Sequence, residues 1–389
     1  MGGRRLEPRY LGRVPGIGRA RRCHPDRVFD LDADDLVDTD ARRSFRSHAN
    51  YLHAFAMVIR GGMFVTSTVA LSRVTRAVAD FPAPNGSRRH DQETLHGCLV
   101  RAWGAELLLA TGRRIATDDE LLRLINSWGV VQAYYVAYSA TQALIVAEGR
   151  ARPPAHPTTQ RQAVDLWVTR RGAVAPWSFA VASPTHRLAG ADGAINGPGR
   201  PIREVHPWTG CDPQSCWDIA ALALRTTRDH AVDEALANER DRKLSARRRA
   251  WRDEEEARHA AGRQPRKQPA WPATARLAAE ESQAVRDKVR PYTTLDYLYR
   301  LRVKANYEDA TVFTEGPEDE DSSDTVARDL ELVASATLLA HELRVGQLIG
   351  GDTMMNMVDA WLASNAQQHN VALAARRNLL DQHLRPQHG

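Results

Sequence analysis

Cysteines, lysines and long apolar runs are scarce in this chain of 389 residues, and each shortage excludes a class of protein. The four cysteines are too few and too scattered for a disulfide framework. The Arg-rich first residues lack the apolar core of a secretory signal. The most apolar stretch, Tyr51–Leu71, is interrupted by Arg60, Gly61 and Gly62, so we expect no membrane span there. These absences predict a soluble, cytoplasmic protein.

Arginine supplies nearly all of the positive charge, because the chain has only four lysines: Lys243, Lys267, Lys288 and Lys304. So strong a bias is typical of a GC-rich coding preference and is not by itself a sign of phosphate recognition. The net charge of +5 and the pI near 9.1 permit nucleic acid as a partner without requiring it.

The longest regular pattern predicts a central helix over residues 118–148. Apolar residues recur there at three- and four-residue steps, the helical period. Thr117 and Glu120 have the spacing of a capping box, and Gly149 suits the left-handed turn after a helix. Gly129 is expected to weaken or bend the helix in its middle. Four side chains are predicted to be buried against the helices of 219–236 and 294–313: Trp128, Tyr135, Tyr138 and Leu144.

The remaining patterns predict an all-α fold, a multi-helix bundle around the central helix with charged insertions. No alternating β-branched run and no repeat is present. An acidic linker is expected at 315–324, before a further helix. We predict five parts: a disordered basic arm (1–30), N-terminal helices (31–115), a helical core (116–236 with 292–349), a charged Arg/Glu-rich insertion (237–291) and C-terminal helices (350–389).

Two of the predicted helices resemble helices of the HEPN family, the nucleotide-binding bundles of higher eukaryotes and prokaryotes. YYVAYSATQALIVAEG (134–149) is similar to the family's second helix, which is rich in Tyr and Ala and ends in a Leu/Ala-Gly pattern. LYRLRVKANYED (298–309) is similar to its late helix, where Arg precedes an Ala-Asp/Asn-Tyr pattern. The order agrees, but the interval between them is longer than in a minimal member and would hold an insertion.

The resemblance implies RNA or a nucleotide as substrate or partner, a homodimer, and no cofactor. Ribonucleases of the family cleave RNA without a metal, with Arg followed after four to six residues by His. Arg225 and His230 match that motif and are the candidate catalytic pair, in which His moves protons and Arg stabilises phosphate charge. Candidate nucleotide-binding residues are Arg228, Arg302, Asn306 and Tyr307.

The spacing of Arg225 and His230 is weak support on its own. The same spacing recurs elsewhere, as in Arg43–His48, because Arg and His are both frequent. Residues five apart on a straight helix also point about 140° apart, so a joint site requires that the helix end or bend, or that a second subunit complete it. The alternative function is a non-catalytic helical scaffold that binds protein or nucleic acid through its Arg-rich surface.

Two further motifs are weaker. His206, Cys211 and Cys216 could bind zinc with a fourth ligand, although their spacing departs from the common two-residue cysteine pair, and no metal site is predicted. The Gly-rich stretch 188–201 lacks the Gly-Lys-Ser/Thr ending of a phosphate-binding loop.

Overall fold

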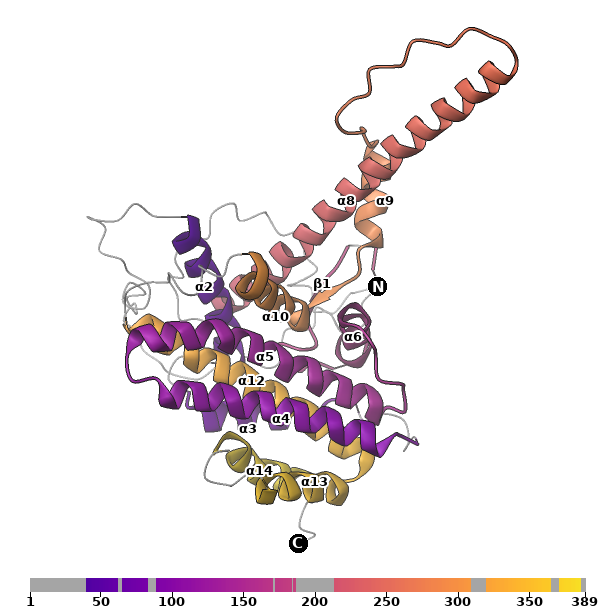
Figure 1. Ribbon diagram of the computed structural model, residues 1–389. Coiled ribbons are helices and arrows are strands. Elements are labelled where there is room, and N and C mark those ends of the chain that lie inside the picture. Colours follow the sequence, from indigo (N-terminus) through magenta and orange to yellow (C-terminus); the bar gives the residue numbers. More distant parts are fainter. Residues whose placement is uncertain are drawn as a thin grey trace, which may run out of the picture.

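The computed structural model describes the chain between residues 40 and 385 with gaps; the described ranges are 40–61, 65–82, 89–170, 172–183, 185–186, 213–308, 320–364 and 371–385. The predicted arm at 1–30 lies outside them. The fold is all-α, as predicted (Figure 1). Within the described ranges, the strands are the two-residue β1 (Ala180–Val181) and β2 (Tyr292–Thr293), which pair antiparallel.

The described chain forms eleven α-helices and two π-helical segments. They are α2 (Asp40–Arg60), α3 (Ser67–Ala79), α4 (Gln92–Ile115), α5 (Asp119–Ala147), α6 (His156–Ala163), η1 (Val164–Val168), α8 (Pro213–Ala260), α9 (Ala279–Lys288), α10 (Thr294–Val303), η2 (Lys304–Glu308), α12 (Glu320–Ile349), α13 (Gly351–Ser364) and α14 (Val371–Leu384). Helix α12 begins inside the predicted acidic linker, where Asp324 forms an ion pair with Arg113 of α4.

Helix α5 is the predicted central helix, with one correction at its start. The N-cap is Asp118, whose carboxylate accepts a hydrogen bond from the Leu121 N–H at 2.8 Å. Thr117 instead donates its hydroxyl proton to that carboxylate, so the expected Thr117 cap is wrong. The end is as predicted, with Gly149 at a φ of 76°, a conformation that glycine adopts without steric strain.

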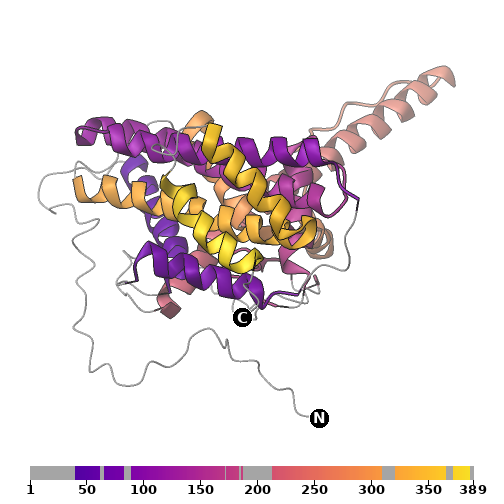
Figure 2. The same ribbon diagram turned by 90° about the horizontal axis from the view of Figure 1, so that it is seen from below.

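Gly129 neither ends nor interrupts α5. A Cβ atom at this position would lie 3.1 Å from a Leu109 methyl group of α4 and 3.2 Å from one of Leu330 of α12. The glycine therefore permits three helices to approach closely. Helices α4 and α12 are the main neighbours of α5, and the views in Figures 1 and 2 show the three packed side by side.

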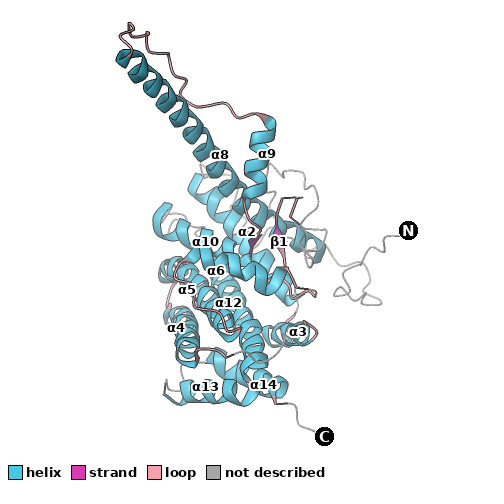
Figure 3. Ribbon diagram, turned by 90° about the vertical axis from the view of Figure 1, so that its right-hand side faces the viewer, coloured by secondary structure: helices cyan, strands magenta, loops and turns pink. Residues whose placement is uncertain are grey.

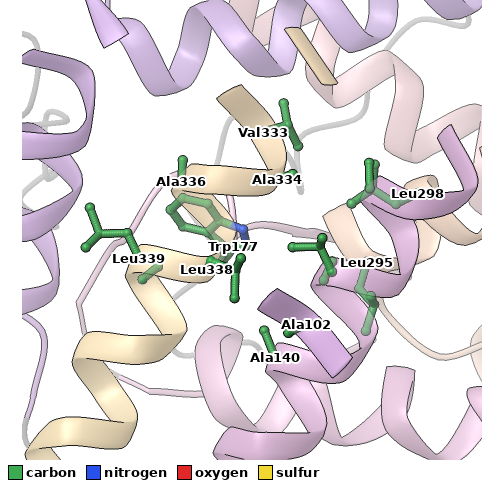
Figure 4. Packing of buried hydrophobic residues seen from close by; sticks show 14 of the residues in the cluster. Ala102, Ala140, Trp177, Leu295, Leu298, Val333, Ala334, Ala336, Leu338 and Leu339 are labelled. Carbon is green, nitrogen blue, oxygen red and sulfur yellow. The ribbon is translucent and has the colours of Figure 1, made fainter. Parts of the chain in front are cut away.

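One continuous hydrophobic core joins the N-terminal helices, α5, α12 and the C-terminal helices. Figure 4 shows the Trp177 indole lodged beside Val333, Ala336 and Leu339 of α12. Its N–H donates a hydrogen bond to the Thr337 hydroxyl at 3.1 Å, which satisfies the one polar atom of the ring. Packing therefore does not separate the predicted N-terminal, central and C-terminal parts into independent cores.

Two buried glutamates and one arginine tie α14 to α4 and α12. Arg376 of α14 is fully buried and forms ion pairs with Glu106 of α4 and with Glu342 of α12. The Trp103 indole N–H also donates to Glu342, at 2.7 Å. Burial is the main cause that raises the pKa of Glu106, and Arg376 opposes it.

The predicted burial along α5 holds for only half of the named side chains. Tyr138 and Leu144 are buried, but Trp128 is 64% exposed and Tyr135 is 36% exposed. Trp128 and Tyr135 are seven residues apart, so they lie on one face of the helix about 10.5 Å apart along its axis. Helix α5 packs chiefly against α4 and α12, and it also contacts α10, as predicted. Helix α8, which we had also expected to cover it, is not among its main neighbours.

The charged insertion at 237–291, which we call the arm from here on, projects away from the body, as Figures 1 and 3 show. Its first part continues α8 as a single helix of 48 residues, and α9 returns along it. The arm pairs its own charges: Arg266 contacts Glu254 at 2.9 Å and also Glu255, while Lys243 bonds Glu281. The composition is thus that of a solvated helix, as the alternation of Arg and Glu indicates.

Helix α5 is also the one described helix that is long and apolar enough to span a membrane, by length and composition. In its most apolar window, 89% of the residues are buried inside the protein.

Candidate functional site

Six aromatic and basic side chains gather where α10 crosses α5, and we call them the tyrosine cluster. Its members are Tyr134, Tyr135 and Tyr138 of α5, His156 of α6, and Tyr299 and Arg302 of α10. Helical spacing explains the grouping, because residues three or four apart share a face. The cluster joins the two segments that resemble the HEPN family, since α10 packs directly against α5.

The guanidinium group of Arg302 lies among three tyrosine rings. Its central carbon is 5.6 Å from the ring centroid of Tyr134, 5.4 Å from that of Tyr135 and 5.7 Å from that of Tyr299. Distances below about 6 Å place a cation within reach of the negative face of an aromatic ring. Arg302 is therefore held by an aromatic surround and brings positive charge to it.

Tyr134 and His156, which are hydrogen-bonded to each other within the cluster, are both uncharged. The Tyr134 hydroxyl and His156 Nδ1 share a hydrogen bond of 2.6 Å, and either can donate, depending on the histidine tautomer. Burial, and then the charge of Arg302, lowers the pKa of His156, so the imidazole is uncharged at neutral pH. Burial is also the main cause that raises the pKa of Tyr134, which keeps its proton. Arg302 is thus the single charge of the cluster.

The rim of the cluster is open to solvent. Tyr134 and Tyr138 are buried, whereas Tyr135 is 36% exposed, and Trp128 on the same face of α5 is 64% exposed. Two accessible aromatic residues about 10.5 Å apart along the axis of α5, one of them next to a guanidinium group, make a surface on which planar rings can stack. Sequence reasoning assigned no role to Tyr299 or His156; the signal for Tyr299 was its three-residue spacing from Arg302.

The predicted catalytic pair does not converge within one chain. Arg225 is half-buried and His230 is exposed, both in the first half of α8, which continues to Ala260. Since the helix does not end there, the two side chains leave it about 140° apart. The pair stays a prediction, and its geometry requires a group from elsewhere, such as a second subunit.

The other predicted residues lie at the base of the arm and along α10 and η2. Arg228 is buried, and its guanidinium donates to the carbonyls of Arg286 at 2.8 Å and Val289 at 3.1 Å, so it fastens the return of the arm. Asn306 and Tyr307 belong to η2, which follows α10 directly. Arg302 is the predicted residue that the fold brings into the tyrosine cluster.

The zinc hypothesis falls mostly outside the described residues. His206 and Cys211 lie there, whereas Cys216 is described and buried. Across the parts of the chain that the structure describes, no three His, Cys, Asp or Glu side chains are grouped closely enough to hold a metal ion.

Comparison with known proteins gives no independent guide to function. The chain matches no protein-family model, no curated protein and no solved structure.

Proposed function

We propose that the protein binds single-stranded RNA, or a nucleotide, at the tyrosine cluster. One observation carries the proposal: Arg302 lies among three tyrosine rings, one of which is the partly exposed Tyr135, and the exposed Trp128 lies on the same face of α5. Every nucleobase has a π-face, so exposed aromatic rings bind bases with little dependence on sequence. The resemblance of both contributing segments to the HEPN family supports the same ligand class.

The magnitudes are sufficient for measurable binding. Stacking of one base on an aromatic side chain contributes about 1–3 kcal/mol, and two accessible rings could hold two bases of a strand. Arg302 adds attraction for the phosphates, which weakens as salt rises. The single net charge of the cluster predicts a shallow dependence of affinity on salt, unlike that of a protein that tracks many phosphates.

Fluorescence anisotropy of a labelled 12-nucleotide RNA tests the proposal. Tyr135→Ala and Arg302→Gln should each raise the Kd about 5-fold to 150-fold, the range that corresponds to 1–3 kcal/mol. The control removes three charges from the arm, Arg247→Gln, Arg248→Gln and Arg249→Gln together, and should have a smaller effect. If the arm variant loses binding and the cluster variants keep it, the Arg-rich surface is the nucleic-acid site and the proposal is wrong.

A second candidate function is protein binding, and it has its own observation. Four apolar side chains are exposed on the α4–α5 hairpin, by 48% to 64% of their surface: Leu108, Ile115, Leu124 and Trp128. Exposed apolar surface is what a scaffold would present to a partner. The double variant Leu108→Glu and Ile115→Glu separates the functions, because it should abolish a protein interaction and leave RNA affinity unchanged.

A further inference from the structure

A pocket separate from the tyrosine cluster is lined by α2, α8 and α10 with η2. Figure 1 shows α10 lying between α2 and the base of the projecting helix α8. The volume of the pocket is about 300 Å³. The side chains that define its chemistry are His48 and Tyr51 of α2, Thr226 of α8, and Tyr297, Arg300 and Lys304 of α10 and η2. Tyr297 joins two of these walls, because its hydroxyl donates to the His48 carbonyl at 3.1 Å.

The pocket is positively charged. Arg300 and Lys304 lie four residues apart on one side of the helix, and none of the described residues that line the pocket is acidic. Like charges at this spacing repel each other, and an anion between them would remove the repulsion. Arg300 is held in place, since one guanidinium N–H donates to the Thr226 carbonyl at 2.6 Å. Lys304 begins the π-helical segment η2, and such segments are frequent at functional sites.

His48 adds a buried polar atom without a partner. His48 lines the pocket and is only 8% exposed, and its Nδ1 has no hydrogen-bond partner among the described residues. An unsatisfied buried nitrogen destabilises the folded protein, so its presence calls for an explanation such as a bound group. Burial, then Lys304 and Arg300, lowers the pKa of His48 to about 3, which leaves the ring neutral and able to donate from one nitrogen.

We propose that this pocket binds a phosphate group, as inorganic phosphate or as the terminal phosphate of a small phosphomonoester. Arg presents a planar set of donors that matches phosphate oxygens, and Lys supplies a compact charge beside it. The volume is at the lower limit of small-molecule sites. Lining residues 297, 300 and 304 share one side of α10 and η2, whereas cluster residues 299 and 302 share the opposite side. The inference therefore does not depend on the proposed RNA site.

Isothermal titration of the full chain with inorganic phosphate tests this assignment. Binding should be measurable, and Lys304→Gln should weaken it at least about tenfold, the loss expected for a bond to a charged group. The matched control is Lys288→Gln, at an exposed position on α9, and it should leave phosphate affinity unchanged. Arg300→Lys keeps the charge but removes the planar donors, so it should also weaken binding.

Two further measurements make the outcome decisive. Unfolding midpoints of the variants show whether a loss of binding reflects a loss of fold. Titration with glycerol 3-phosphate, a phosphomonoester that has no base to stack on the tyrosine cluster, separates the two ligand sources: tighter binding than phosphate identifies a phosphomonoester, and equal binding identifies the phosphate group alone. The assignment is overturned if phosphate gives no binding heat, or if Lys288→Gln and folded Lys304→Gln weaken binding equally.

Discussion

The buried Glu106–Arg376–Glu342 triad gives a sharp test of how the C-terminal helices are held. Arg376→Met keeps most of the side-chain volume but removes the positive charge that pairs with both carboxylates. Removing one partner of a buried ion pair destabilises a protein by about 3–5 kcal/mol, because the remaining charge stays buried. A total stability of about 5–15 kcal/mol is typical of a domain, so the loss would be a large part of it.

Urea unfolding, followed by circular dichroism, measures this change. The neighbouring Arg377→Met is the matched control, since Arg377 pairs with Asp359 at 2.6 Å on the surface, and such exposed pairs contribute at most about 1 kcal/mol. In the Arg376 variant, the Glu106 carboxyl loses the cation that opposes burial, so its folded-state pKa should lie further above its unfolded value. Because the protonated form of Glu106 then favours the folded state, the deficit should shrink as pH falls from 7 to 5. Equal losses for the two variants, or a deficit that grows in acid, would refute the reasoning.

Two other predictions follow from the buried and exposed histidines. His341 is buried in the core, and burial lowers its pKa from 6.5 to about 4, so the folded state binds fewer protons than the unfolded state. About 3 kcal/mol of stability should therefore be lost as pH falls from 6.5 towards 4, and the loss should be smaller in His341→Gln. Urea midpoints that do not change with pH would contradict this prediction. If Arg225 and His230 form a cleavage site across a dimer, the protein should cut single-stranded RNA in EDTA and leave a 2′,3′-cyclic phosphate. His230→Ala should then abolish cutting, while His259→Ala, an exposed histidine on the same helix, should not; equal effects would exclude the pair.

Most of the fold could be predicted from the helical period of the apolar residues. It placed the central helix, its end at Gly149 and the helices on either side, because a buried helix must present apolar residues every three to four positions. What it could not give is which faces are covered. Trp128 and Tyr138 have equally helical surroundings in the sequence, but one is 64% exposed and the other 9%. That difference depends on where α4, α10 and α12 pack, which a single helix does not encode.

The sites were less accessible to sequence reasoning than the fold. Arg302 was found through the resemblance of its helix to a nucleotide-binding family, and Tyr134 and Tyr135 lie in the other resembling segment. The phosphate pocket was missed, because His48, Thr226 and Arg300 come from three distant segments. His48 was noted only as part of the spaced pair Arg43–His48, to which no function was assigned. Spacing along the chain does not predict a pocket that is formed by three helices.

The most direct test of RNA binding at the tyrosine cluster is to map where RNA touches the protein. Single-stranded RNA that contains 4-thiouridine can be cross-linked by light, and the modified tryptic peptides can be identified by mass spectrometry. The tryptic peptide 124–150 contains both Trp128 and Tyr135. We predict that cross-links concentrate in it and disappear in Tyr135→Ala. Cross-links confined to the arm at 240–267, with none in 124–150, would contradict the account.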